Sequence, residues 1–70
     1  MQKYEAPIYY DKKRVKWEGD VTSALEFYIH VTRSDAQGII EAQGGLMEYC
    51  YKQNYDALKT AQMVDLASRV

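Results

Sequence analysis

The stretch Ala24-Leu25-Glu26-Phe27-Tyr28-Ile29-His30-Val31-Thr32 carries the clearest structural pattern in the chain. Its large apolar residues fall at every second position, and glutamate, tyrosine, histidine and threonine alternate with them. A period of two in a segment rich in β-branched and aromatic residues is typical of a half-buried strand. The alternative is a helix that starts at Val21 and is capped by Asp20. That helix would spread the apolar side chains around most of its circumference, so we expect a strand over residues 24–32.

The residues before this stretch predict two further strands, over about 5–10 and 13–18. The polar segment Asp11-Lys12-Lys13 supplies the turn between them. A slip of two residues between paired strands preserves the sidedness of every side chain. A two-residue turn and a four-residue turn give registers that differ by such a slip. In both registers one face therefore collects the same apolar side chains: Ile8, Tyr10, Val15 and Trp17.

The second half of the chain changes to a helical period. A helix over about 35–53 follows a capping box formed by Ser34 and Gln37. Gly44-Gly45 lies inside this helix and costs roughly 1–2 kcal/mol relative to alanine, so a break there stays open. A last helix is expected over 55–68, capped by Asn54, with these inward positions: Ala57, Leu58, Ala61 and Val64.

These elements predict a single α+β domain over residues 1–70. A three-stranded antiparallel meander (about 5–10, 13–18 and 24–32) exposes one polar face, and two helices pack on the apolar one. A chain of 70 residues has a marginal core, and such scaffolds often add disulfides, a metal or a partner chain. Cys50 is the single cysteine, and with His30 it gives too few ligands for zinc. We therefore expect no metal or cofactor, and expect a homodimer.

Composition narrows the class of protein further. Hydrophobic residues make up 47% of the sequence, which is too apolar for a disordered segment, yet no run approaches a membrane span. The first residues lack the apolar stretch of a signal peptide, and a lone thiol fits a reducing compartment. These features predict a cytoplasmic protein that does not enter a membrane.

One cluster of residues is a candidate for binding nucleic acid or a partner. Basic and aromatic side chains interleaved on a sheet could contact phosphates and stack on bases. The hairpin and the outer sheet face would carry them: Lys12, Lys13, Arg14, Lys16, Tyr9, Tyr28 and His30. A solvated face with cross-strand ion pairs explains the same residues, and the net charge of -1 creates no general attraction to nucleic acid.

A second cluster consists of Tyr49, Tyr51 and Tyr55, because tyrosine is enriched at protein interfaces. No catalytic arrangement is evident. His30 and Glu26 would be neighbours on a helix but lie about 13 Å apart on a strand. Cys50 sits among apolar residues, where a cysteine packs as a small hydrophobe.

The sequence therefore predicts a small non-enzymatic protein–protein interaction module, an accessory or regulatory protein acting as a homodimer with no evident small-molecule substrate. The alternative is a small nucleic-acid-binding regulator that uses the basic hairpin and outer sheet face. Short reading frames of this kind are common on phages and plasmids, although no residue shows such an origin.

Overall fold

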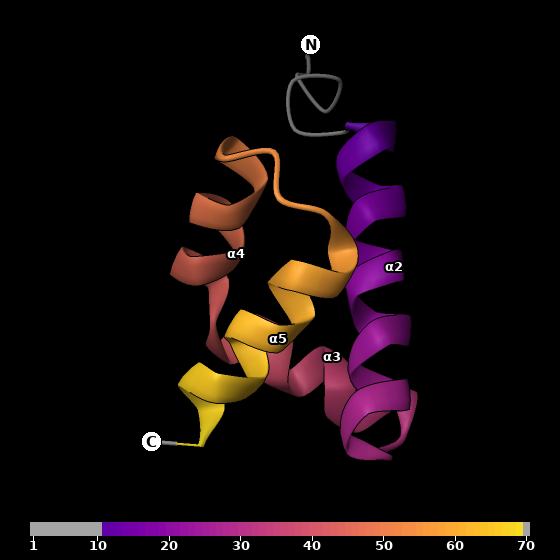
Figure 1. Ribbon diagram of the computed structural model, residues 1–70. Helices are drawn as coiled ribbons and strands as arrows, with labels where there is room; N and C mark the ends of the chain where they lie inside the picture. Colours follow the sequence, from indigo (N-terminus) through magenta and orange to yellow (C-terminus); the bar gives the residue numbers. More distant parts are fainter. Residues whose placement is uncertain (1–10, 70) are drawn as a thin grey trace, which may run out of the picture.

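A computed structural model describes residues 11–69, and over this range the chain is helical and contains no strand. The elements are α2 (Lys12–Ile29), α3 (Arg33–Ala42), α4 (Gly44–Lys52) and α5 (Ala57–Ser68). Figure 1 shows α2 upright on one side and α4 on the other, with α5 running obliquely between them and α3 near the lower end of α2. The prediction of an α+β fold with a three-stranded meander is therefore wrong.

Helix α2 replaces two of the expected strands. The strand over 13–18 lies inside it, and the strand over 24–32 is divided between its last turns and the connection to α3, which ends at the N-cap Thr32. The turn residue Asp11 instead caps α2, because its Oδ1 accepts from the amides of Lys13 and Arg14 at 3.0 and 3.2 Å. The expected strand over 5–10 lies outside the described residues.

A stripe of period four explains why residues 12–29 form a helix. Trp17, Val21 and Leu25 recur every four residues, and Val21 and Leu25 are fully buried. The alternating apolar residues do not share a face, since Leu25 is 0% exposed and Phe27 is 78% exposed. Burial of the period-four stripe thus outweighs the strand preference of the residues around it.

His30 ends α2. Its φ of 56° and ψ of 47° place it in the left-handed region, and its amide donates to the carbonyl of Glu26 at 2.9 Å. Thr32, rather than Ser34, then caps α3, because its hydroxyl accepts from the amide of Asp35 at 3.2 Å. The N-cap predicted at Ser34 therefore lies two residues earlier, at Thr32.

The helix expected over 35–53 is split. Gln43, with φ of -111° and ψ of 36°, ends α3 and precedes α4, so the break falls one residue before Gly44-Gly45. In the loop before α5, Asp56 is the cap and accepts from the amide of Lys59 at 2.8 Å. Asn54 instead takes a left-handed φ of 60°, which asparagine tolerates.

The core is small and lies between α2 and the other helices. Its members are mostly aliphatic and short: Val21, Leu25, Ala36, Met47, Ala61 and Val64. Cys50 is buried as expected, and its Sγ lies 3.9 Å from Sδ of Met63 on α5. Trp17 packs against this cluster from outside, and its indole Nε1 donates to the carbonyl of Tyr55 at 2.9 Å.

The backbone of His30 yields a stability prediction. An L-residue with a Cβ pays a steric cost in the left-handed region that glycine avoids. The exposed His30 side chain contributes little packing. His30→Gly should therefore raise the free energy of unfolding by about 0.5–1 kcal/mol in urea denaturation, and His30→Val should lower it. A glycine variant that is less stable than the native chain would contradict this helix end and favour an extended segment.

Candidate interaction surfaces

The four basic residues of the expected hairpin lie instead in the first turns of α2. Arg14 is half-buried and forms two ion pairs, with Nε 3.1 Å from Glu18 and Nη1 2.6 Å from Glu48. Lys16 pairs with Asp20 at 3.0 Å. Lys12 and Lys13 are exposed and form no ion pair with another described residue. Among residues 11–69 there is neither a basic hairpin nor an outer sheet face.

The Arg14 cluster joins the start of α2 to the end of α4. The Arg14 guanidinium lies over the ring of Tyr51, 5.1 Å from its centroid, and the Tyr51 hydroxyl donates to Asp11 at 2.8 Å. The hydrogen bond from Arg14 lowers the pKa of Glu48 and raises the pKa of Arg14 itself. The bond from Tyr51 likewise lowers the pKa of Asp11. These contacts have a structural role and leave little of Arg14 for an external ligand.

The lowered pKa values of Glu48 and Asp11 predict that the folded protein loses stability in acid. The Glu48 carboxyl, with an ordinary pKa of 4.5, titrates at lower pH when folded, so its stabilising effect is present above that value and is lost as pH falls through the folded pKa. Glu48→Gln should therefore flatten the fall in unfolding free energy between about pH 5 and pH 3, measured by urea denaturation. Asp20→Asn is the control. If both variants kept the native acid profile, the Arg14–Glu48 pair would have no energetic role.

The three tyrosines of the second predicted cluster each contact another aromatic ring of the chain, and Tyr51 and Tyr55 are half-buried. Tyr51 lies against Trp17, with ring centroids 5.1 Å apart. Tyr49 and Tyr55 meet edge to face at 6.2 Å, and Nζ of Lys59 lies 4.2 Å from the centroid of the Tyr55 ring. Tyr49 remains 49% exposed, so one of the three still offers an open surface.

The remaining candidates lie far from the basic residues. Lys12 and Tyr28 are separated by about 24 Å along α2, at 1.5 Å per residue. Tyr28 faces α5, where the Gln62 amide donates to its hydroxyl. His30 is exposed at the helix end, and the Glu26 carboxylate is bound by Nη1 of Arg33 at 2.8 Å. Tyr9 lies outside the described residues.

An apolar surface that the sequence did not predict extends over the outer face of α5 and the last turns of α2. Its exposed apolar side chains are Phe27 at 78%, Leu66 at 65% and Leu58 at 54%. Leu58, Gln62 and Leu66 follow one another every four residues on α5, and Gln62 reaches Tyr28. We call these five residues the α2–α5 edge: Phe27, Tyr28, Leu58, Gln62 and Leu66. Phe27 joins this surface beside Tyr28, on the outer side of α2.

Two of the earlier predictions are corrected by this edge. Phe27 was expected on the buried face of a sheet and Leu58 in the core, yet both are largely exposed. The available signal was the four-residue spacing of Leu58, Gln62 and Leu66 beside the core-facing series Ala57, Ala61 and Val64.

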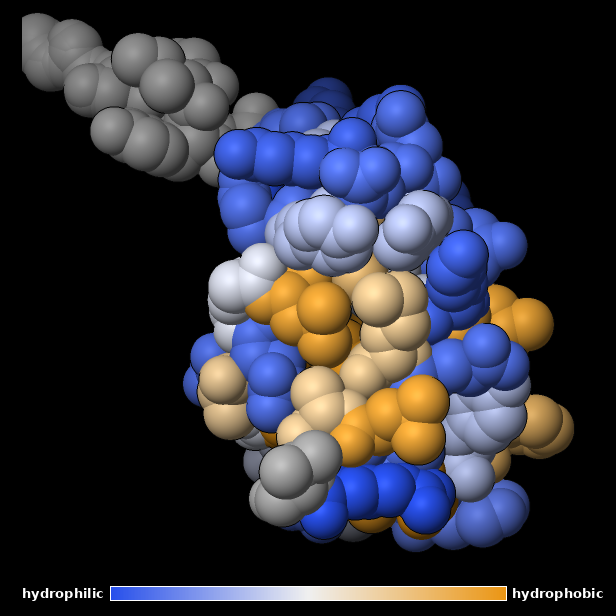
Figure 2. Space-filling model, turned by 60° about the vertical axis from the view of Figure 1, so that its left-hand side comes forward, coloured by the Kyte–Doolittle hydropathy of each residue, from blue (hydrophilic) through white to orange (hydrophobic). Residues whose placement is uncertain are grey.

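The face formed by α4 and the end of α5 carries apolar surface of a different kind. Leu46 on α4 and Met63 and Ala67 on α5 are half-buried. Figure 2 shows a hydrophobic area in the middle of this face, framed by hydrophilic residues. Because these side chains are already partly covered by the fold, they expose less than the α2–α5 edge.

Comparisons with protein-family models, with curated proteins and with solved structures found no match. Within residues 11–69, no three histidine, cysteine, aspartate or glutamate side chains are grouped so that they could hold a metal ion. No helix of that range combines the length and the apolar character needed to cross a membrane.

Proposed function

We propose that this protein is a homodimeric protein-interaction module and that the α2–α5 edge is the surface through which two copies associate. The observation that carries this proposal is the contrast between the edge and the core. Leu25 and Met47 are the largest fully buried side chains, whereas Phe27, Leu58 and Leu66 are each more than half exposed. A chain with so small an apolar core gains stability when a second copy covers its exposed apolar side chains.

Most charges around the edge are paired within the chain and so do not oppose self-association. Lys59, beside Leu58, has no ion pair with a described residue, and its Nζ lies over the Tyr55 ring. A twofold interface brings a surface against itself, so unpaired charges would meet charges of the same sign. Near the edge, Asp65 is paired with Arg69 at 3.0 Å, and Glu26 with Arg33 at 2.8 Å. The polar groups of Gln62 and Tyr28 bond to each other. Association would therefore bring no unpaired charge of Asp65 or Glu26 against its own copy.

Burial of these apolar side chains would supply a substantial part of the free energy of association. Fully burying a leucine or phenylalanine side chain contributes about 1.5–3 kcal/mol, and a twofold contact buries each such residue in both copies. Phe27 and Leu66 supply most of this area because they are the two most exposed apolar side chains. They are therefore the positions where a substitution should weaken the dimer most.

Sedimentation equilibrium tests this proposal. The double variant Phe27→Lys with Leu66→Lys should raise the dimer dissociation constant at least about a hundredfold, because it replaces apolar contacts with charges that face their own copies. Lysine suits both positions, since each lies near a helix C-terminus. Val15→Lys, at a residue that is 50% exposed elsewhere on α2, is the matched control and should dimerise as the native chain does.

A native protein that stays monomeric up to about millimolar concentration would overturn the proposal, since that concentration corresponds to only about 4 kcal/mol of association. Equal weakening by Val15→Lys would instead move the interface away from the α2–α5 edge.

A further inference from the structure

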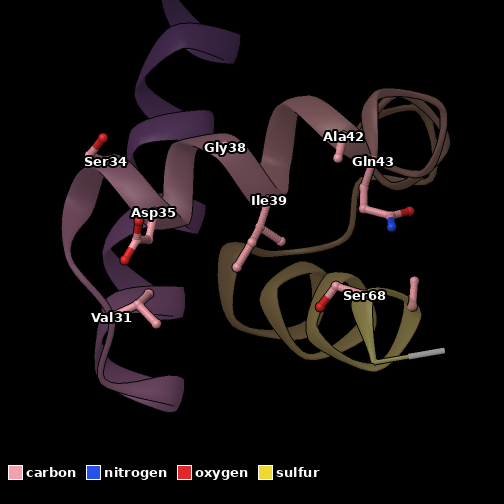
Figure 3. Close-up of a pocket in the computed structure, with 9 residues that line it drawn as sticks. Val31, Ser34, Asp35, Gly38, Ile39, Ala42, Gln43 and Ser68 are labelled. Carbon is pink, nitrogen blue, oxygen red and sulfur yellow. The ribbon is translucent and has the colours of Figure 1, made fainter.

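Two hollows flank α3, one on each side. The first, of about 630 Å³, lies between α3 and the end of α5, and Figure 3 shows Val31 and Ile39 pointing into it with Ser68 on the opposite wall. The second, of about 430 Å³, lies between α2 and α3 and includes Val15 and Ile40. Both hollows therefore combine an aliphatic lining with polar rims.

The exposed face of α3, which also forms one wall of the first hollow, carries small residues. Ser34, Gly38 and Ala42 are exposed and follow one another every four residues, so they lie along one face of the helix. A Cβ placed on Gly38 would meet no atom within 4 Å. Another helix could therefore approach the backbone of α3 closely and set side chains into the hollows on both sides.

The charges of this surface differ from those of the rest of the protein. Most carboxylates of residues 11–69 pair with an arginine or lysine of the same chain: Glu18, Asp20, Glu26, Glu48 and Asp65. Asp11 and Asp56 cap helices. Asp35 and Glu41 have neither an ion pair nor a hydrogen bond to their carboxylates from a described residue. Asp35 lines the first hollow. Glu41 lines the second together with Arg33, whose guanidinium is engaged by Glu26.

We propose that α3 binds a basic amphipathic helix of a partner protein, which crosses α3 at Gly38 and carries lysine or arginine toward Asp35 and Glu41. Apolar side chains of the partner occupy the two hollows, and its cations neutralise the two carboxylates. Asp35 and Glu41 are about 9 Å apart along α3, close to two turns of a facing helix.

A second copy of this chain fits the α3 surface poorly. Two α3 helices crossing antiparallel at Gly38 would bring Asp35 of one copy toward Glu41 of the other, and like charges repel. The α3 surface is therefore distinct from the α2–α5 edge, and this proposal stands whether or not the protein dimerises.

The probe is a synthetic peptide of about 18 residues built from leucine, alanine and lysine as an amphipathic helix, with a glutamate-for-lysine version as the charge control. Binding is followed by fluorescence anisotropy, and amide shifts of the ¹⁵N-labelled protein locate it. We expect the lysine peptide to shift amides of α3 and the glutamate peptide to bind at least about tenfold more weakly.

Three variants test the site. Asp35→Asn with Glu41→Gln should weaken the lysine peptide about tenfold, whereas Asp20→Asn with Glu48→Gln removes the same charge elsewhere and should change binding less than twofold. Gly38→Leu fills the crossing point and should reduce binding at least tenfold, while the open space around Gly38 allows the fold to persist. Circular dichroism of each variant checks that fold.

Three outcomes would overturn the proposal: no binding of the lysine peptide, equal loss in the control pair, or shifts outside α3 and its hollows. Phe27→Lys with Leu66→Lys should bind the peptide normally. That variant separates failure of the α3 site from failure of the dimer, because it removes the α2–α5 edge and leaves α3 intact.

Discussion

The packing of α2 against α5 is the contact on which the other helices depend. Val21 and Leu25 are the large side chains that α2 buries, and α5 meets them with Ala61 and Val64. The small alanine lets the two helix axes approach, and the bond from the Trp17 indole to the carbonyl of Tyr55 fixes where the loop before α5 meets α2. Helices α3 and α4 then complete the core, each with few buried side chains.

The first half of the chain shows why a correct pattern can indicate the wrong element. The apolar residues of this segment do alternate with polar ones: Leu25, Phe27, Ile29 and Val31. They do not share a face, however, because Phe27 is exposed on α2 and Val31 lies beyond the end of that helix. The series Trp17, Val21 and Leu25 was equally visible in the sequence and predicted the helix. Period two and period four overlap in so short a segment, and only burial against α5 decides between them.

The second half was more predictable because helical spacing continues there over many residues. The helix ends were missed where two capping residues compete within two positions, Thr32 with Ser34 and Asn54 with Asp56. The glycine pair indicated a weak point in the long helix but not that Gln43 would be the break. The spacing of Leu58, Gln62 and Leu66 indicated a second stripe on α5, but not that this stripe stays exposed, since the exposure of Leu58 depends on the angle at which α5 meets α2.

The burial of Cys50 against Met63 makes the chain's single thiol a chemical reporter of internal motion. A thiol reacts with an alkylating reagent only when the reagent reaches it, so modification requires α4 to separate from α5. Under conditions where closing is faster than alkylation, the reaction rate gives the free energy of that opening. The kinetics of one covalent reaction thereby measure how firmly the last two helices are held together, in a native chain that needs no added label.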